Sequence, residues 1–245
     1  MSIEQWYYEL RVLGKRVIFT PLLLALGSAL FAVFLQAREV DPARFLSGML
    51  EIVLPIATAV VVATIASSDP AIELQLTTPR RYLYTATKRI ALILGWAIVI
   101  ALLCSILLTV LRMAYMPQQM LGWAAPLSFL ANQLTWLAPL LWLAALGLCL
   151  ALLLRSRAAS SAILGGIWIL EIIFKDVLAA TSWLQPVLLF PTTLILFPSA
   201  LIPNSVFQVW LSTRLEIAGT GLVLLALGWL LLRNPEGLLK GASEE

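Results

Sequence analysis

The chain has 245 residues, of which 61% are hydrophobic and 12% are charged, and its mean hydropathy is +0.97. Soluble domains are about half apolar and about a quarter charged, so this balance excludes a soluble fold and predicts an all-α integral membrane protein. The net charge is only +3, and no basic run interleaved with aromatic residues supports nucleic-acid binding. The absence of His excludes His-based catalysis and His-containing zinc sites.

The whole chain, 1–245, is predicted to be a single membrane domain, because no hydrophilic block is long enough to form a soluble one. Residues 1–16 are predicted to form an amphipathic helix in which Ile3, Trp6 and Leu10 recur at helical spacing. Trp and Tyr favour the headgroup region, so this helix is expected to lie flat on the membrane surface. The alternative is a cytoplasmic extension of the first span.

Six apolar stretches are predicted to cross the membrane, since a spanning helix needs about 20 mostly apolar residues. Cys104 and Cys149 both lie inside these stretches, which argues against a disulfide framework or a metal site. The predicted spans are residues 17–36, 45–66, 90–111, 130–154, 158–174 and 215–232.

Residues 177–214, between the fifth and sixth spans, are apolar but irregular. Four prolines cut them into short pieces, and hydrocarbon offers no partner for the backbone groups that each proline frees. We therefore expect a re-entrant extracellular hairpin of short helices rather than one badly kinked span. The four prolines are Pro186, Pro191, Pro198 and Pro203.

The distribution of Lys and Arg predicts the orientation of the chain. Eleven of them fall on the side that holds both termini and residues 67–89, and five fall on the other side. Cytoplasmic loops carry the excess of Lys and Arg, so both termini and residues 67–89 are expected in the cytoplasm of a multi-pass plasma-membrane protein.

Residues 67–89 are the longest polar interruption between spans. Asp69 and Pro70 are a helix-start signal, and Pro79 ends the short helix that they begin. The apolar side chains on this helix cannot bury much within the membrane domain, and an exposed apolar face on a surface helix suggests a docking partner. The alternative is a solvated loop with an anchoring rim.

This loop resembles the first cytoplasmic loop of ABC-2 type transporter permeases, on the sequence from Glu73 to Arg81, ELQLTTPRR. The predicted architecture of the whole chain is similar to that family as well. The resemblance implies a dimer of permeases, each docked on an ATPase subunit that drives export by alternating access. It implies that the docking residues are Asp69, Ile72, Glu73, Leu74, Leu76, Pro79, Arg80 and Arg81.

The chain itself is predicted not to be an enzyme. A P-loop needs Gly-x-x-x-x-Gly-Lys-[Ser/Thr], whereas Gly14-Lys15 is followed by Arg16 and preceded, five residues earlier, by Glu9. ATP and Mg are therefore expected on the partner ATPase, with no cofactor in this chain. The alternative function is a secondary transporter driven by an ion gradient.

Three glutamates, Glu51, Glu171 and Glu216, fall inside or near the spans, where a central charge costs roughly 2.5–3.5 kcal/mol. Their candidate partners are Arg44, Lys175 and Arg214. One interpretation is an extracellular gate; the other is that these charges lie near the interface and snorkel. The predicted gate residues are Glu171, Lys175, Arg214 and Glu216.

The fifth predicted span is rich in small residues. Ser161 and Gly165 form a small-xxx-small pair, which permits close approach of a second helix. That helix could belong to the same subunit or to a second one. The ABC-2 resemblance favours a dimer interface, because that family dimerises through its first and fifth spans.

Overall fold

The structure is a computed structural model that describes residues 15–67, 79–111, 113, 122–190 and 210–233. No described residue lies in a strand, so the all-α prediction is confirmed. The predicted interfacial helix, apart from Lys15 and Arg16, lies outside the described residues, as do residues 68–78 of the predicted docking loop.

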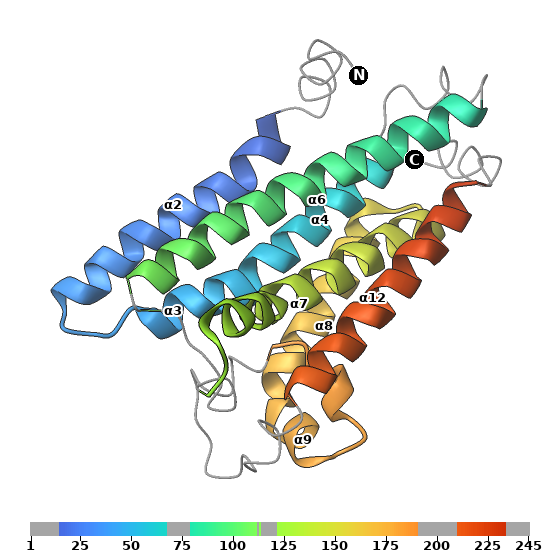
Figure 1. Cartoon of the computed structure of the whole chain (residues 1–245). Coiled ribbons are helices and arrows are strands. Elements are labelled where there is room, and N and C mark those ends of the chain that lie inside the picture. Colours follow the sequence, from blue (N-terminus) through green and yellow to red (C-terminus); the bar gives the residue numbers. More distant parts are fainter. Residues whose placement is uncertain (1–14, 68–78, 112, 114–121, 191–209, 234–245) are drawn as a thin grey trace.

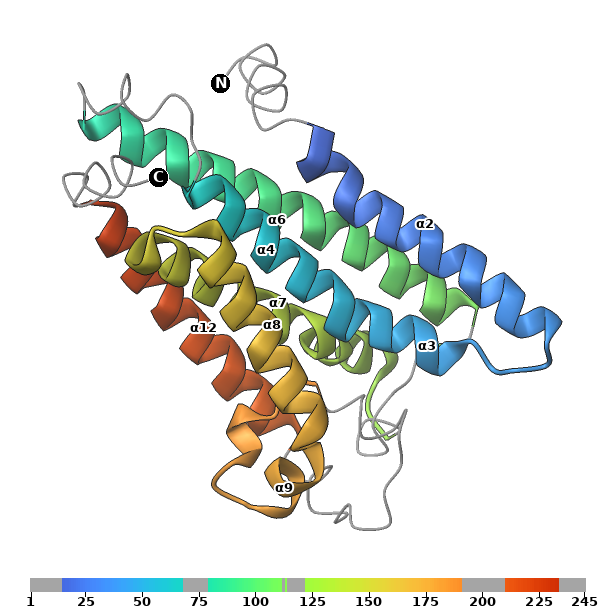
Figure 2. The same ribbon diagram turned by 180° about the vertical axis from the view of Figure 1, so that it is seen from behind.

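Among the described residues, six long helices lie side by side, two short segments lead into α4 and two follow α8 (Figures 1 and 2). The long helices are α2 (Lys15–Ala37), α4 (Leu54–Ser67), α6 (Pro79–Val110), α7 (Ala125–Leu154), α8 (Arg157–Ile173) and α12 (Trp210–Leu232). The short segments are α3 (Ala43–Gly48), the π-helix η1 (Met49–Val53), α9 (Lys175–Ala180) and the 3-10 helix η3 (Gln185–Val187).

Within the described residues, five helical stretches are long and apolar enough to cross a membrane, which supports the membrane-protein prediction. The other predicted span corresponds to α8, whose 17 residues would be about 26 Å long, slightly less than the hydrocarbon core of about 30 Å. The five stretches are Val17–Ala37, Phe45–Ala66, Leu83–Val110, Ala125–Leu154 and Trp210–Leu232.

Successive long helices run in opposite directions (Figure 1). The starts of α2, α6 and α8 and the ends of α4, α7 and α12 meet at one end of the bundle, and α9 lies at the opposite end. We call these the basic end and the α9 end. The basic end is named for its Lys and Arg residues: Lys15, Arg16, Arg80, Arg81, Arg155, Arg157 and Arg233. All described Asp and Glu residues lie toward the α9 end.

Three helices begin at least five residues before the predicted span. Helix α6 begins at Pro79 rather than at residue 90, and α7 begins at Ala125 rather than at residue 130. In both cases a proline lies in the first turn, where its missing N–H costs no hydrogen bond, so a residue interpreted as a loop signal is a helix start. Helix α12 begins at Trp210 rather than at residue 215, which places Arg214 in a helix rather than in the predicted hairpin.

Helix α7 lies at the centre, in close contact with α4 and α12. A Cβ atom added to Gly147 would lie 2.7 Å from the Ala59 carbonyl oxygen, and one added to Gly221 would lie 3.0 Å from the Trp142 backbone nitrogen. Without side chains at Gly147 and Gly221, backbones approach closely, as in tightly packed membrane helices. The three helices therefore form one compact unit.

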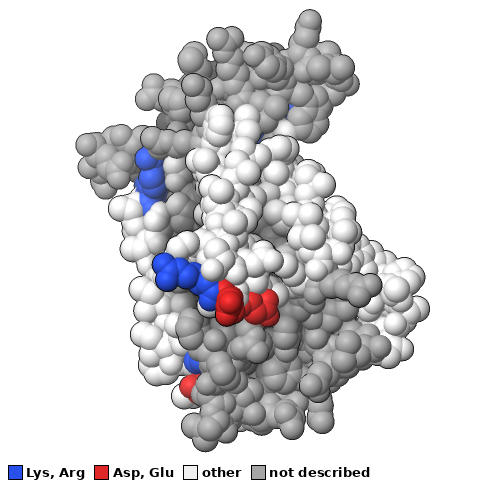
Figure 3. Space-filling view, turned by 90° about the vertical axis from the view of Figure 1, so that its left-hand side faces the viewer, with Lys and Arg blue, Asp and Glu red and all other residues white. Residues whose placement is uncertain are grey.

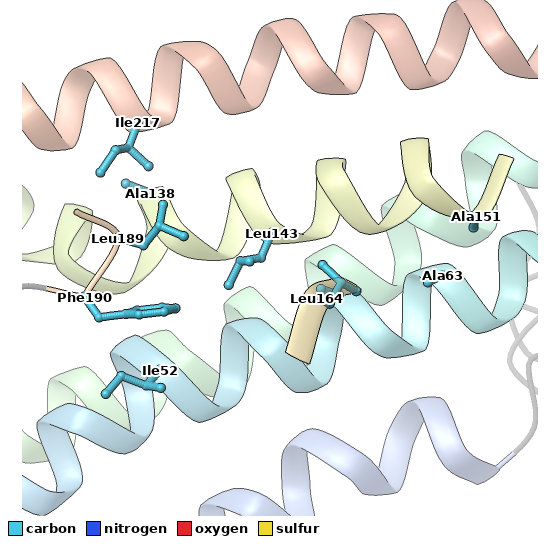
Figure 4. Packing of buried hydrophobic residues seen from close by; sticks show 10 residues of the cluster. Ile52, Ala63, Ala138, Leu143, Ala151, Leu164, Leu189, Phe190 and Ile217 are labelled. Carbon is cyan, nitrogen blue, oxygen red and sulfur yellow. The ribbon is translucent and has the colours of Figure 1, made fainter. Parts of the chain in front are cut away.

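The core extends beyond the helices into the segment that follows η3. Leu189 and Phe190 are each 1% exposed and pack with Ile52, Leu143 and Ile217 (Figure 4). Phe190 lies between α7 and the helical run that carries Ile52 (Figure 4). This segment is therefore anchored in the interior of the bundle at the α9 end.

The outer surface is apolar, as the membrane setting requires. Large side chains on the outer faces of the long helices are well exposed, among them Leu30 at 75% and Val110 at 73%. In water an apolar surface of this extent would drive aggregation, whereas in a bilayer it faces lipid.

Candidate functional site

Three charged side chains from distant parts of the sequence meet in the interior near the α9 end. Glu51 of η1 is 0% exposed, Glu171 of α8 is 5% exposed and Arg214 of α12 is 1% exposed. We call these three residues the charge cluster. Ionisable side chains inside a membrane protein are costly and mark functional positions, so this cluster is the candidate site.

The cluster holds the backbone of the segment after η3 from two sides. Arg214 donates from Nη1 to the Leu189 carbonyl oxygen at 2.7 Å and from Nη2 to the Leu188 carbonyl oxygen at 2.6 Å. The Leu189 N–H donates to Oε2 of Glu171 at 3.3 Å. Charged groups make the stronger hydrogen bonds, so this backbone is fixed between α8 and α12.

The guanidinium group also faces Glu51. Its Nη1 lies 3.8 Å from Oε1 of Glu51, which is an ion-pair distance and longer than a hydrogen bond. Arg214 also interacts electrostatically with the Glu171 carboxylate. The two carboxylates thus offset the free-energy cost of burying the arginine. Through its contacts with them, the Arg214 side chain of α12 links η1 and α8.

Two buried donors beside this region have no hydrogen-bond acceptor among the described residues: Nε of Arg214 and Nε1 of Trp168. A buried donor without an acceptor costs about 1–3 kcal/mol. Such groups are rare in proteins, and an ordered water or an ion can satisfy them. Trp168 lies on α8, one turn from Glu171. Both donors are therefore available to a water molecule or another polar group at this end of the bundle.

The π-helical segment has a local cause in the sequence. Pro55 has no N–H, so it cannot donate to the carbonyl of Glu51 four residues earlier, and its ring clashes with that carbonyl. The preceding turn is widened to the π-helical register, in which the Leu54 N–H donates to the Met49 carbonyl. Single π-helical turns occur often at functional sites, and here the widened turn carries Glu51.

The predicted gate residues divide into two groups. Glu171 and Arg214 are brought together, whereas Lys175 begins α9 and is half-buried, and Glu216 is exposed on α12. Helical spacing explains the difference on α12, because Arg214, Ile217 and Gly221 share its buried face and Glu216 does not. Residues 191–209 of the predicted re-entrant hairpin lie outside the described residues.

The other predicted site residues lie apart from the charge cluster. Pro79, Arg80 and Arg81 form the first turn of α6 at the basic end, and the remaining docking residues lie outside the described residues. Ser161 is half-buried, and a Cβ atom added to Gly165 would meet nothing within 4 Å. The small-residue face of α8 is therefore open at Gly165.

Sequence reasoning missed a second polar group, on α7. Gln133 donates to the Phe129 carbonyl at 3.0 Å and accepts a hydrogen bond of 2.9 Å from Nε1 of Trp136. Asn132 accepts one of 3.2 Å from Thr135. The sequence signal that could have revealed this group is a pair of adjacent amide side chains in an otherwise apolar run. Their partners lie one turn away on the same helix, so the group is satisfied locally and needs no ligand.

Loss of the Glu171 carboxylate is expected to destabilise the segment after η3. Glu171→Ala leaves the buried Leu189 N–H without an acceptor, which should cost about 1–3 kcal/mol and lower the midpoint of thermal unfolding in nanodiscs. Glu171→Gln keeps an acceptor oxygen and should lower the midpoint of thermal unfolding by a smaller amount. Glu216→Ala is the control, because the same change on an exposed side chain should leave the midpoint unchanged. Equal midpoints for the two alanine variants would contradict this account.

Comparison of the chain with protein-family models, with characterised proteins and with solved structures gives no match. Within the residues that the structure describes, no three His, Cys, Asp or Glu side chains are grouped so as to hold a metal ion.

Proposed function

We propose that the chain is the permease subunit of an ATP-driven exporter of the ABC-2 type, coupled to a separate ATPase subunit. The observation that carries this proposal is the path of one helical run. From Ala43 to Ser67, α3, η1 and α4 follow one another without a break. One end of this run leads into the predicted docking loop, and the region near its other end carries Glu51 of the charge cluster.

The path provides a route for mechanical coupling. Glu51 and Ser67 are separated by about 24 Å along a helix, and a helix transmits displacement along its axis with little deformation. Closure of an ATPase on residues 69–79 would move the end of α4 and shift Glu51 against Arg214. Arg214 holds the backbone of Leu188 and Leu189, so the movement would reach the segment at the α9 end. In this mechanism the charge cluster is the extracellular gate.

The charge distribution supports the orientation that this mechanism needs. The end of α4, the start of α6, the start of α2 and the end of α12 lie at the basic end. By the positive-inside rule the basic end faces the cytoplasm, where ATP is available. With α8 counted as a crossing, the helices alternate in direction through six crossings. The open small-residue face of α8, at Ser161 and Gly165, is the proposed contact with a second permease subunit.

The test is reconstitution with the ATPase. We expect a complex of two permease and two ATPase chains by mass, with ATP hydrolysis that depends on the permease. Leu74→Asp places a charge at a predicted docking residue and should abolish the coupling, whereas Glu73→Ala should reduce it. Gln75→Asp adds the same charge at a position outside the predicted docking residues and should preserve coupling. A complex that keeps full coupling with Leu74→Asp would contradict the docking assignment.

A secondary transporter is the second candidate, favoured by the burial of Glu51 and Glu171. Carboxylates inside membrane bundles serve in proton and ion pathways. This function predicts uptake or release driven by a proton or sodium gradient in proteoliposomes that contain this chain alone. Transport that requires ATP and the second subunit, and ignores both gradients, would exclude it.

A further inference from the structure

A cavity of about 410 Å³ lies between α2 and the half of α6 nearest the α9 end. We call it the α2–α6 cavity. It is closed on its inner side by residues of α3, η1 and the start of α4, and its lining is apolar except for Ser28 and Gln36. Ser28 is satisfied within its own helix, because its hydroxyl donates to the Ala25 carbonyl at 2.8 Å. The cavity therefore offers almost no polar group to a ligand.

Contacts at both ends of α2 hold the cavity open. Nε1 of Trp96 on α6 donates to the Ile18 carbonyl at 3.1 Å, which fixes the start of α2 against α6. Near the other end, the ring of Phe31 packs against the ring of Phe45 on α3, with centroids 4.7 Å apart. Between these two contacts the small side chains of Ala25, Ala29 and Ala32 line the space. The two contacts thus fix the position of α2 near its ends, and the small side chains between them leave the space.

The dimensions of the cavity favour one kind of occupant. Along α2 its lining runs from Pro21 to Gln36, a length of about 22 Å at 1.5 Å per residue. A long lining that is almost wholly apolar suits an extended hydrocarbon chain, which needs only van der Waals contacts along its length.

The position of the cavity also favours a hydrocarbon chain as its occupant. Its length exceeds one half of a hydrocarbon core of about 30 Å, and its outer rim is formed by lipid-facing side chains such as Leu26, Val33 and Leu107. Its polar end, at Gln36, lies beside the turn that carries the exposed charges Arg38, Glu39 and Asp41. Figure 3 faces this end of α2 and shows a short band of adjoining basic and acidic side chains, with mostly uncharged side chains elsewhere in the described part of this face. Such a band belongs at the headgroup level.

We propose that the α2–α6 cavity is a binding site for one phospholipid acyl chain, with the headgroup at the Arg38 turn. The hydrocarbon fills the apolar length between the two contacts, and the polar headgroup meets the charged band. A void of this size lined by apolar groups forfeits van der Waals contacts on one side, and a chain taken from the surrounding bilayer restores them. The site does not depend on the transport function proposed above.

The experiment uses the full chain in nanodiscs that contain a phospholipid with a photoreactive diazirine in the middle of one acyl chain. Adducts are mapped by peptide mass spectrometry. We expect them to concentrate on the lining of α2 and α6. Ala32→Trp and Ala29→Trp fill the cavity and should each reduce this labelling several-fold. Ala29 is exposed, so its variant serves where Trp at the buried Ala32 impairs folding.

Ala226→Trp is the matched control, since it makes the same change on an exposed position of α12 and should leave the labelling of α2 and α6 unchanged. Adducts spread evenly over all lipid-facing helices, or labelling that both cavity-filling variants leave unchanged, would overturn the proposal. Cys104 lines the cavity and provides a second readout. Efficient oxidative crosslinking of Cys104 between two chains would assign the cavity to a dimer interface and also overturn the proposal.

Discussion

Arg214→Leu is expected to be the most destabilising single substitution in the charge cluster. It removes both donors to the carbonyls of Leu188 and Leu189 and leaves Glu51 and Glu171 buried without their shared cation. Removal of one partner from a buried ion pair costs about 3–5 kcal/mol. We expect a large fall in the midpoint of thermal unfolding of the detergent-solubilised protein, together with loss of the folded fraction on size-exclusion chromatography.

Arg233→Leu is the control on the same helix. Arg233 is exposed at the basic end and lies over the ring of Trp229, with its guanidinium carbon 3.8 Å from the ring centroid. This contact is worth about 0.5–1 kcal/mol at an exposed site, so the midpoint should change little. Arg214→Lys keeps the charge but cannot donate to both carbonyls in the planar geometry of a guanidinium, and it should fall between the two.

The electrostatic part of this explanation has its own test. Glu51→Gln combined with Arg214→Leu removes one of the stranded charges, so the double variant should be more stable than Arg214→Leu alone. Contacting residues show such non-additive effects. If the two substitutions simply add, the ion pair between Arg214 and Glu51 at 3.8 Å contributes nothing to stability.

Gly147→Ala is expected to separate α4 from α7. The new methyl group would lie 2.7 Å from the carbonyl oxygen of Ala59, and that oxygen belongs to the backbone of α4, which has no rotamer to change. Overpacking in a tight interior costs about 1–3 kcal/mol even where side chains can adjust. We expect a lower midpoint of thermal unfolding, and in the reconstituted exporter a loss of coupling, because α4 is the proposed link between the ATPase and the gate.

Gly95→Ala provides the comparison for this effect. Gly95 lies within α6, and a Cβ atom added there would meet nothing within 4 Å. Alanine is the better helix former by about 1 kcal/mol, so this variant should be as stable as the original or slightly more stable. A fall in stability of the same size at both glycines would point to a general effect of glycine in these helices rather than to contact between α4 and α7.

The membrane-protein class and the approximate positions of the helices could be predicted from the sequence. Apolar stretches of spanning length are readable because a crossing of the hydrocarbon must be mostly apolar and its backbone must be helical. The widened turn at Glu51 was not predicted, although Pro55 supplies its local cause. The positions of helix starts were less accurate, since Pro79 and Pro126 are compatible with either a loop or a first helical turn.

Which charges meet depends on the tertiary structure. Glu51 precedes Glu171 by 120 residues (171 − 51), and Glu171 precedes Arg214 by 43 (214 − 171). Their partners include the backbone carbonyls of Leu188 and Leu189, which no residue type reveals. The α2–α6 cavity has no sequence signature either, because it arises where two helices held together at Ile18 and Trp96 enclose small side chains farther along. Charge and hydropathy are properties of single residues, whereas a buried ion pair or a cavity depends on how distant helices pack against one another.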